Sequence, residues 1–230
     1  MTEAVNLLHL FQLCDSNFPN GGFTQSFGFE TYINQEEIHN AETFGHWLDI
    51  FLRDQLVTSD GLGIRMAYDS IEQNELDKLW HIDRLLTVQN LARETREGTG
   101  QMGKSLINIS IEIYDAPLLV AYQKRIKEGN SNGHPAIVFA IVGEYLKISK
   151  KKTIMFYLYS TMVNFIQNAV RAIPLGQTDG QRLLSSFHPK LQAATDKILN
   201  LDEIEFGTIA PGIELAQMQH ERVTARMFMS

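Results

Sequence analysis

The sequence predicts an all-α protein, a single globular domain over residues 1–230 with about ten helices around a buried central helix. Two patterns predict this class: apolar residues recur at spacings of three and four along most of the chain, and strictly alternating segments are scarce. The lack of repeats, low-complexity tracts and long polar linkers predicts one domain. With 44% hydrophobic residues, a chain of 230 residues can bury a sizeable core.

Helical spacing places the elements, with ends uncertain by about two to four residues. In chain order the expected helices span 3–14, 22–34, 43–58, 60–73, 75–113 with an internal break, 117–128, 135–147, 153–172, 178–186, 189–200 and 212–227. The segment over 153–172 is the most apolar long stretch. Ser160, Asn164 and Gln167 interrupt it, so we expect a buried core helix there and not a membrane span.

In the N-terminal half, turn residues mark where the second helix begins. Pro19, Gly21 and Gly22 favour the backbone angles of a tight turn before the helix over 22–34. That helix would be lined by Phe23, Phe27 and Glu30, with Gly28 allowing close packing. Asn40 or Thr43 is expected to cap the next helix.

In the C-terminal half, prolines and glycines mark most of the boundaries. Pro117 and Pro135 suit first helical turns, and GNSNGHP at 129–135 is the clearest loop. Pro174 should end one helix, after which Gly176 permits a left-handed turn. The following helices are expected to begin at a capping box of Thr178 with Gln181, at Pro189 and after Pro211.

Residues 98–105, GTGQMGKS, match the nucleotide-binding P-loop pattern G-x-x-x-x-G-K-[ST]. A P-loop follows a buried β-strand, whereas the preceding NLARETRE is charged and rich in helix formers. A helical stripe also continues through the motif: Leu91, Thr95, Gly98, Met102, Leu106, Ile109 and Ile113. We therefore interpret the segment as a packed helix. A nucleotide hydrolase that uses Gly98, Gly103, Lys104 and Ser105 is the alternative.

Composition excludes several classes of partner and compartment. The formal net charge of -7 opposes binding to a nucleic-acid backbone. The single cysteine, Cys14, cannot form an internal disulfide, and the acidic start MTEAVNLLHL lacks the cationic region of a secretory signal. We expect a cytoplasmic protein that binds neither nucleic acid nor membrane.

The sequence contains no strong catalytic or metal-binding motif. HERVT at 220–224 begins like a zinc-protease helix, but Thr224 stands where the second histidine would be. The seven histidines are dispersed, no serine lies in a G-x-S-x-G elbow, and Cys14 suits packing better than attack. We expect no catalytic residue and no built-in metal site.

Three stretches together resemble the UreF family of urease accessory proteins. They are FPNGGFTQSFGFE at 18–30, VRAIPLGQTDGQRLL at 170–184 and HERVTARMFMS at 220–230. The residues that carry the resemblance in the first two are Pro19, Gly21, Gly22, Phe23, Ser26, Gly28, Glu30, Pro174, Leu175, Gly176, Gln177 and Gln181. Asn20, Thr24 and Ala172 depart from the family pattern, and the order and spacing of the stretches agree with it.

The resemblance implies an all-helical, non-catalytic nickel-insertion chaperone. Members of this family bind the accessory protein UreD, also called UreH, form a homodimer within the complex, and recruit the GTPase UreG to deliver nickel into apo-urease. It also implies that no cofactor is tightly bound and that nickel in transit is held weakly, in a channel. A helical adaptor for another metalloenzyme is a further alternative.

The resemblance also points to residues that contact partners. The C-terminal tail, 221–230, is a candidate flexible segment that becomes ordered on binding UreD, and Arg226 is the candidate for recruiting the GTPase. His220, Glu221, Met227 and Phe228 flank it. Tyr32 and the segment 19–30 are further candidates for the same surface.

Overall fold

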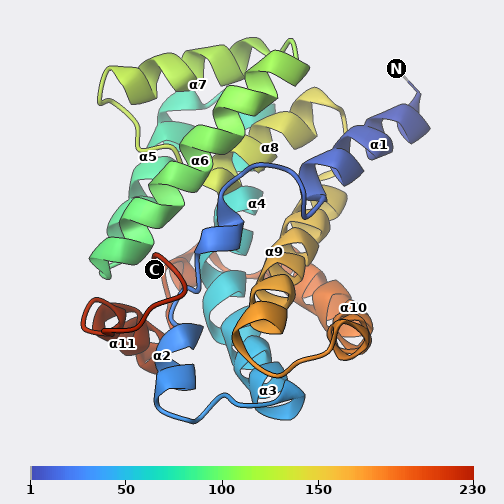
Figure 1. Cartoon of the computed structure of the whole chain (residues 1–230). Helices are drawn as coiled ribbons and strands as arrows, with labels where there is room; N and C mark the ends of the chain where they lie inside the picture. Colours follow the sequence, from blue (N-terminus) through green and yellow to red (C-terminus); the bar gives the residue numbers. More distant parts are fainter. Residues whose placement is uncertain (1) are drawn as a thin grey trace.

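A computed structural model describes residues 2–230, and all regular structure in that range is helical, which confirms the all-α class (Figure 1). The α-helices are α1 (Glu3–Cys14), α2 (Phe29–Asn34), α3 (Ala41–Phe51), α4 (Leu62–Glu72), α5 (Leu76–Val88), α6 (Arg93–Ile113), α7 (Pro117–Lys127), α8 (Pro135–Tyr145), α9 (Lys150–Ala172), α10 (Gln177–Asn200) and α11 (Pro211–His220). A π-helix, Leu52–Gly61, joins α3 to α4. No helix within residues 2–230 combines the length and apolarity needed to cross a bilayer.

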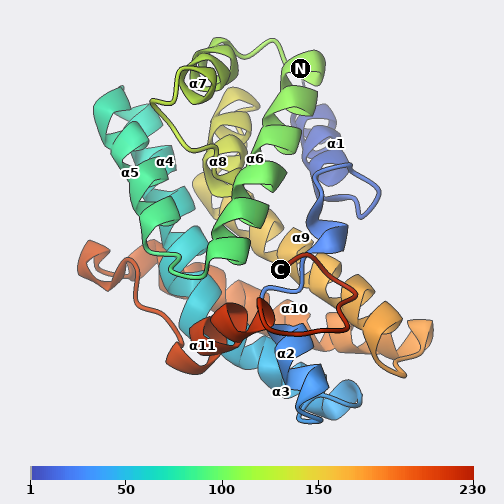
Figure 2. The ribbon, with the colours of Figure 1, turned by 60° about the vertical axis from the view of Figure 1, so that its left-hand side comes forward.

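The buried central helix is α8, and the segment expected to form a buried core helix, 153–172, also lies largely in the core as α9. Every residue from Pro135 to Gly143 is buried, and α8 packs against α4, α6, α7 and α9 (Figures 1 and 2). Its sequence, PAIVFAIVG, is apolar on all faces, and such a helix must be enclosed. In α9 buried and half-buried positions alternate, and the exposed positions are Lys151 and Arg171 near its two ends.

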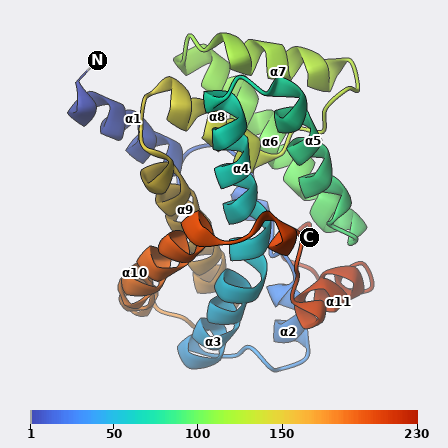
Figure 3. The same cartoon turned by 180° about the vertical axis from the view of Figure 1, so that it is seen from behind.

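The helices expected over 43–58 and 60–73 form one continuous rod, seen from behind in Figure 3. Asn40 begins this rod with the predicted cap: its side chain accepts a hydrogen bond from the Thr43 amide, within a capping box. The central ten residues are a π-helix, which is rare at this length and is common near functional sites. Thr58 and Gln55 accept hydrogen bonds from the amides of Gly207 and Ala210, so the 201–210 loop braces it.

Three predicted boundaries are wrong. The helix expected over 212–227 ends at His220, and turns and bends follow it. The helix expected over 22–34 is broken, because Phe27 and Gly28 have left-handed φ angles of 49° and 98° and only α2 follows them. The helices expected over 178–186 and 189–200 are one helix, α10, with Pro189 inside it. Pro189 leaves a carbonyl of the preceding turn unpaired, and that exposed turn is open to water, so the helix continues.

The expected capping box at the start of α10 does not form. The helix begins at Gln177 after Gly176, and no side chain caps it. Gly176 is in an extended conformation with a φ of -68°, not in the left-handed turn predicted for it. Thr178 and Gln181 therefore lie within the first two turns of the helix and are exposed.

The segment GTGQMGKS lies in the middle of α6, which confirms the packed-helix interpretation and contradicts the P-loop alternative. A Cβ added at Gly98 would lie 2.5 Å from Oε1 of Gln25, and one added at Gly103 would lie 1.7 Å from the carbonyl oxygen of Gly133. The glycines thus admit neighbouring chain segments. The expected stripe is shifted, however: Gly103 is buried where Met102 was expected, and Leu91 precedes the helix and is exposed.

The predicted loop at 129–135 is held in place by Asp83, a fully buried residue of α5. Its carboxylate accepts hydrogen bonds from the Tyr122 hydroxyl and from the amides of Asn132 and His134. These three donors compensate for the burial of the charge. The loop therefore presents His134 to the interior of the molecule.

Candidate partner-binding site

The turn at 18–28 is built from glycine-dependent backbone angles and side-chain hydrogen bonds. Gly21 has a φ of 85°, and Oδ1 of Asn20 accepts a hydrogen bond from the Gly22 amide at 2.9 Å. Nδ2 of Asn168, on α9, donates to the carbonyls of Gly22 and Gln25 at 3.0 and 2.9 Å. A predicted turn is thereby fixed to a helix that lies far from it in sequence.

Gly28 allows the turn to approach α11. Its φ of 98° disfavours any side chain, and an added Cβ would lie 3.2 Å from the Gln217 backbone nitrogen. Nearby, the Thr31 hydroxyl donates to the Ala216 carbonyl at 2.7 Å. The segments 18–31 and 211–220, which are separated by nearly the whole sequence, are therefore packed together.

Glu30 receives the C-terminal tail, which we define as residues 221–230. Its carboxylate accepts hydrogen bonds from the amides of Met227 at 2.5 Å and Phe228 at 3.2 Å. The Met229 amide donates to the Thr24 carbonyl at 2.8 Å. The tail thus lies along the turn and α2, as the red segment ending at C shows in Figure 2.

His220 joins three elements at this site. It is fully buried, with Nε2 2.8 Å from Glu30 on α2 and Nδ1 2.8 Å from Glu94 on α6. Arg226 in the tail donates to the other oxygen of Glu94 at 2.7 Å. The four side chains form a cluster of two carboxylates, a histidine and an arginine, which we call the tail clamp.

The hydrogen bonds of the tail clamp shift the pKa of His220, Glu30 and Glu94 in the direction that favours the charged form of each. Burial lowers the pKa of His220, but its bonds and attraction to Glu30 and Glu94 outweigh burial and raise it. Burial raises the pKa of Glu30, yet the bonds from His220 and the Met227 and Phe228 amides bring it below its usual value. For Glu94, bonds from His220 and Arg226 likewise outweigh burial and lower the pKa.

Phe228 anchors the tail in the core. It is 3% exposed and packs edge-to-face on Phe29, with ring centroids 5.3 Å apart. The Arg171 guanidinium lies 5.5 Å from the Phe228 ring and 3.5 Å from the Phe23 ring, and it donates to the Phe23 carbonyl. Arg171 therefore links the turn and the tail from outside.

The outer side of the site exposes apolar side chains. Phe23, Met227 and Met229 are 57%, 53% and 59% exposed. Met227 and Met229 border a groove of about 530 Å³ between the start of α6 and the tail, which Arg93 and Arg226 also line. Exposed apolar side chains beside arginines on a fixed backbone are typical of a protein-binding surface.

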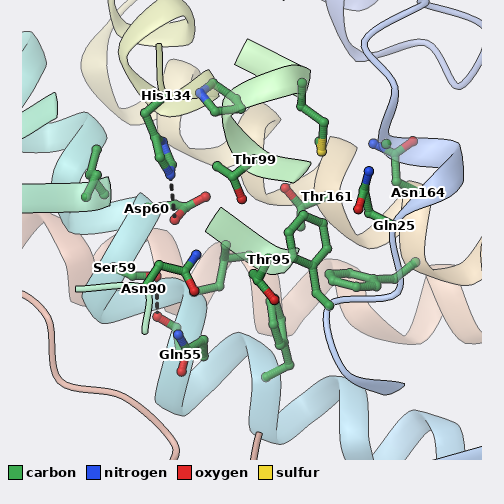
Figure 4. A pocket seen from close by; sticks show the side chains of 18 of the residues that line it. Gln25, Gln55, Ser59, Asp60, Asn90, Thr95, Thr99, His134, Thr161 and Asn164 are labelled. Atoms are coloured by element: carbon green, nitrogen blue, oxygen red, sulfur yellow. Dashed lines mark hydrogen bonds and ion pairs between the residues drawn. The ribbon is translucent and has the colours of Figure 1, made fainter. Parts of the chain in front are cut away.

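A second feature is a cavity of about 90 Å³ bordered by the π-helix, α6, α8 and α9 (Figure 4). Apolar side chains such as Phe51, Leu86 and Phe165 form part of its lining. Its polar lining side chains include Gln25, Gln55, Ser59, Asp60, Asn90, Thr95, Thr99, His134, Thr161 and Asn164. A cavity of this size with such polar groups has room for several waters. Asp60 is the one carboxylate in the lining, and its Oδ2 accepts a hydrogen bond from Tyr157.

His134 faces Asp60 across the cavity, with Nε2 4.0 Å from Oδ1 (Figure 4). Its Nδ1 accepts a hydrogen bond from the Ala136 amide, so in the neutral ring the proton sits on Nε2 and points toward Asp60. His134 is therefore a donor in this cavity and not a metal ligand. Among residues 2–230, no group of three His, Cys, Asp or Glu side chains is placed to hold a metal ion.

Comparison with known proteins identifies the family. Residues 38–188 match the sequence profile of the UreF family. The urease accessory protein UreF of Bacillus sp. (strain TB-90) is 45% identical over 224 residues, covering 97% of this chain and 99% of that protein. The protein of the same name from Lachnoclostridium phytofermentans is 47% identical over 224 residues, covering 97% and 98%.

The chain belongs to the UreF family. This confirms the resemblance read from the three sequence stretches, and it makes the chain an accessory protein and not an enzyme. Two of those stretches, 18–30 and 220–230, meet in the tail clamp and its turn.

The third stretch is a separate element. Leu175 is buried at the turn between α9 and α10, whereas Pro174, Gly176, Gln177 and Gln181 are exposed there. Within residues 2–230, no hydrogen bond or ion pair joins these five residues to the tail clamp. They fix the direction in which α10 leaves α9 and lie outside the candidate site.

The other predicted partner residues lie at the edges of the site. Glu221 is exposed and pairs with Arg93 of α6 at 3.3 Å. Tyr32 is half-buried in a separate groove beside the start of α11, where burial raises the pKa of its hydroxyl. Pro19 is exposed on the turn, and the Ser26 hydroxyl and amide both donate to the Ser230 carbonyl.

Several residues of the tail clamp, its turn and the cavity belong to no recognisable sequence motif. Glu94 lies in the first turn of α6, where acidic residues are common, and Arg171 and Asn168 look like ordinary helix-surface residues. Asp60 and His134 are 74 positions apart and come together only through packing. The only sequence feature near these residues is charge at helix ends, and such charge does not indicate which residues it contacts.

Proposed function

We propose that this chain is a scaffold for urease maturation that binds UreD, recruits the GTPase UreG and passes nickel toward apo-urease. The observation that carries the proposal is the site formed by the turn and the tail. There the backbone is fixed by Glu30, while Phe23, Met227, Met229 and Arg226 remain on the surface. The family assignment supports a role with other urease maturation factors.

Within this site Arg226 is the proposed contact for the GTPase. Its side chain is 37% exposed, so part of the guanidinium is free to meet a partner while Glu94 fixes its position. A preorganised arginine loses less conformational entropy on binding than a mobile one. Met227 and Met229 supply adaptable apolar contacts beside it.

The cavity supports the proposed passage of nickel. Its polar side has hydroxyl and amide groups and one carboxylate, that of Asp60, and such a set binds a divalent cation weakly and releases it. A rigid cage of thiolates and imidazoles would instead retain nickel. Nickel is cargo in this proposal, and the chain holds no resident metal.

The proposed complex forms in the cytoplasm and contains a homodimer of this chain. Exposed apolar residues on α1 favour further protein contacts, since Val5, Leu8 and Phe11 are 40%, 65% and 54% exposed along one face. In Figure 1 this helix extends away from the body of the molecule. An apolar stripe on a projecting helix suits a protein interface.

The test is size-exclusion chromatography with light scattering on the chain mixed with UreD, then with UreG, GTP and Ni²⁺. The native chain should form both complexes. Arg226→Ala should keep UreD and lose UreG by about tenfold or more in affinity. Arg222→Ala is the matched control, because Arg222 is an exposed arginine four residues earlier in the same tail.

Two results would contradict the proposal. The site assignment fails if Arg222→Ala and Arg226→Ala weaken the complex equally, or if helical content falls together with binding. If the chain binds neither partner, the scaffold role is wrong.

A further inference from the structure

We propose that Glu94 is the positioning residue of the C-terminal tail: it holds His220 as an imidazolium and Arg226 at the surface, so the tail docks only while His220 is protonated. The inference rests on the proposed function only because the tail belongs to the proposed partner-binding site. Its evidence is the geometry of the tail clamp, in which one buried ring lies between two carboxylates.

The hydrogen-bond pattern requires two ring protons. Nε2 and Nδ1 each lie 2.8 Å from a carboxylate oxygen, and an ionised carboxylate can only accept. A neutral ring donates from one nitrogen and would turn the lone pair of the other toward a carboxylate. Loss of the proton therefore breaks one bond and leaves an unbalanced negative charge in a buried site.

The two carboxylates are themselves held in the ionised form. Arg226 donates to Glu94 at 2.7 Å, and the amides of Met227 and Phe228 donate to Glu30. These donors oppose protonation of either carboxyl group. The mobile proton of the cluster therefore belongs to His220.

The charged groups of the surrounding elements do not alter the assignment of the mobile proton to His220. Arg93 of α6 pairs with Glu221 at 3.3 Å and with Glu97 at 4.0 Å, outside the clamp. Arg171 of α9 lies over Phe23 and Phe228. Among the described residues, the charged side chains within hydrogen-bonding distance of the His220 ring are Glu30 and Glu94.

The pH dependence follows from the directions of the pKa shifts. The pKa of His220 is raised above its ordinary value of 6.5, so its contribution to docking is complete below that pH and is lost as the pH rises through the raised value. The pKa values of Glu30 and Glu94 are lowered from 4.5, so their contribution is lost only as the pH falls through the lowered values. The tail is therefore docked across the interval between these limits.

Nuclear magnetic resonance on the isolated full chain tests the inference directly. Imidazole nitrogen shifts report the protonation of His220, and labelled methionine methyl groups at Met227 and Met229 report docking. We expect an imidazolium at pH 7, and we expect the two methyl signals to change with the same midpoint as His220 when the pH is raised. A neutral His220 with the tail still docked overturns the proposal.

Two glutamine variants on α6 separate positioning from a general charge effect. Glu94→Gln should lower the His220 midpoint by about one pH unit or more, which is tenfold in proton affinity. Glu97→Gln removes the same charge three residues along the same helix and should leave the midpoint within about 0.3 of a unit. Equal shifts in the two variants contradict a specific role for Glu94.

A folding defect and a failure of the proposed function are both distinguishable from failure of the clamp. Far-ultraviolet circular dichroism checks the fold of each variant, and the titration of the native chain needs no variant. Binding to UreD and UreG at a fixed pH of 7 tests the proposed function separately. If the complex forms but the methyl signals of Met227 and Met229 do not change as His220 titrates, only the clamp proposal is contradicted.

Discussion

The glycines of GTGQMGKS share one helix but have different surroundings. Gly103 lies against the backbone of the 129–135 loop, whereas no atom lies within 4 Å of a Cβ added at Gly100. Glycine lowers helix stability in both places by about 1 kcal/mol relative to alanine. Its role is therefore packing at Gly103, and at Gly100 the structure gives no reason for it.

Substitution with alanine should have opposite effects at these two glycines. Gly103→Ala should lower the free energy of unfolding by about 1–3 kcal/mol or more, because the contact is with the Gly133 backbone, which cannot move aside cheaply. Gly100→Ala should raise it by up to about 1 kcal/mol. Urea denaturation measures both, and destabilisation at Gly100 would contradict this account of α6.

At Pro189 the packing of the whole of α10, and not the preference of one residue, determines whether the helix continues. The sequence places a boundary there, yet α10 continues from Gln177 to Asn200 because its buried face, including Leu184, Phe187 and Leu191, packs continuously. Packing of an apolar face outweighs the lost hydrogen bond. The π-helix is a similar case, since no periodicity marks it and the 201–210 loop braces it from outside.

Removing this proline should stabilise α10. Pro189→Ala restores a backbone donor and should raise the free energy of unfolding by about 1–3 kcal/mol, because proline is the poorest helix former. Ser185→Ala, an exposed change one turn earlier, should stay within about 0.5 kcal/mol. Thermal and urea unfolding would show both effects, and equal changes in the two variants would argue against a cost at Pro189.

The cavity belongs to the whole molecule, because its walls come from segments spread over most of the sequence. The π-helix contributes Asp60, the loop before α8 contributes His134, and α9 contributes Tyr157. Burial of these polar groups costs free energy that an apolar core would avoid. Retaining them is consistent with a cavity used for transport.

Neutralising the cavity should slow nickel transfer and leave assembly intact. Asp60→Asn keeps an acceptor for Tyr157 but removes the one carboxylate, so nickel-dependent urease activation in a reconstituted system should fall several-fold. Asp54→Asn changes a half-buried carboxylate on the same π-helix that pairs with Arg53 outside the cavity, so it is the control and should have no effect. Normal activation with Asp60→Asn would remove the cavity from the nickel path.

The sequence by itself determined the helical class, most helix positions, a cap at Asn40 or Thr43, an internal break within 75–113, and the packed-helix nature of 98–105. These features depend on neighbouring residues, so local spacing and capping chemistry reveal them. The motifs at 18–30 and 220–230 also indicated which family to expect.

Only the tertiary structure decided which helix is central, where chain direction changes at Phe27 and Gly28, and which residues meet. Glu94 completes the tail clamp, and Asp60 faces His134, through contacts between positions far apart in sequence. Such contacts are set by the packing of whole helices, which carries no local pattern. For that reason the sequence was enough to indicate the family, whereas the site could be identified only in the tertiary structure.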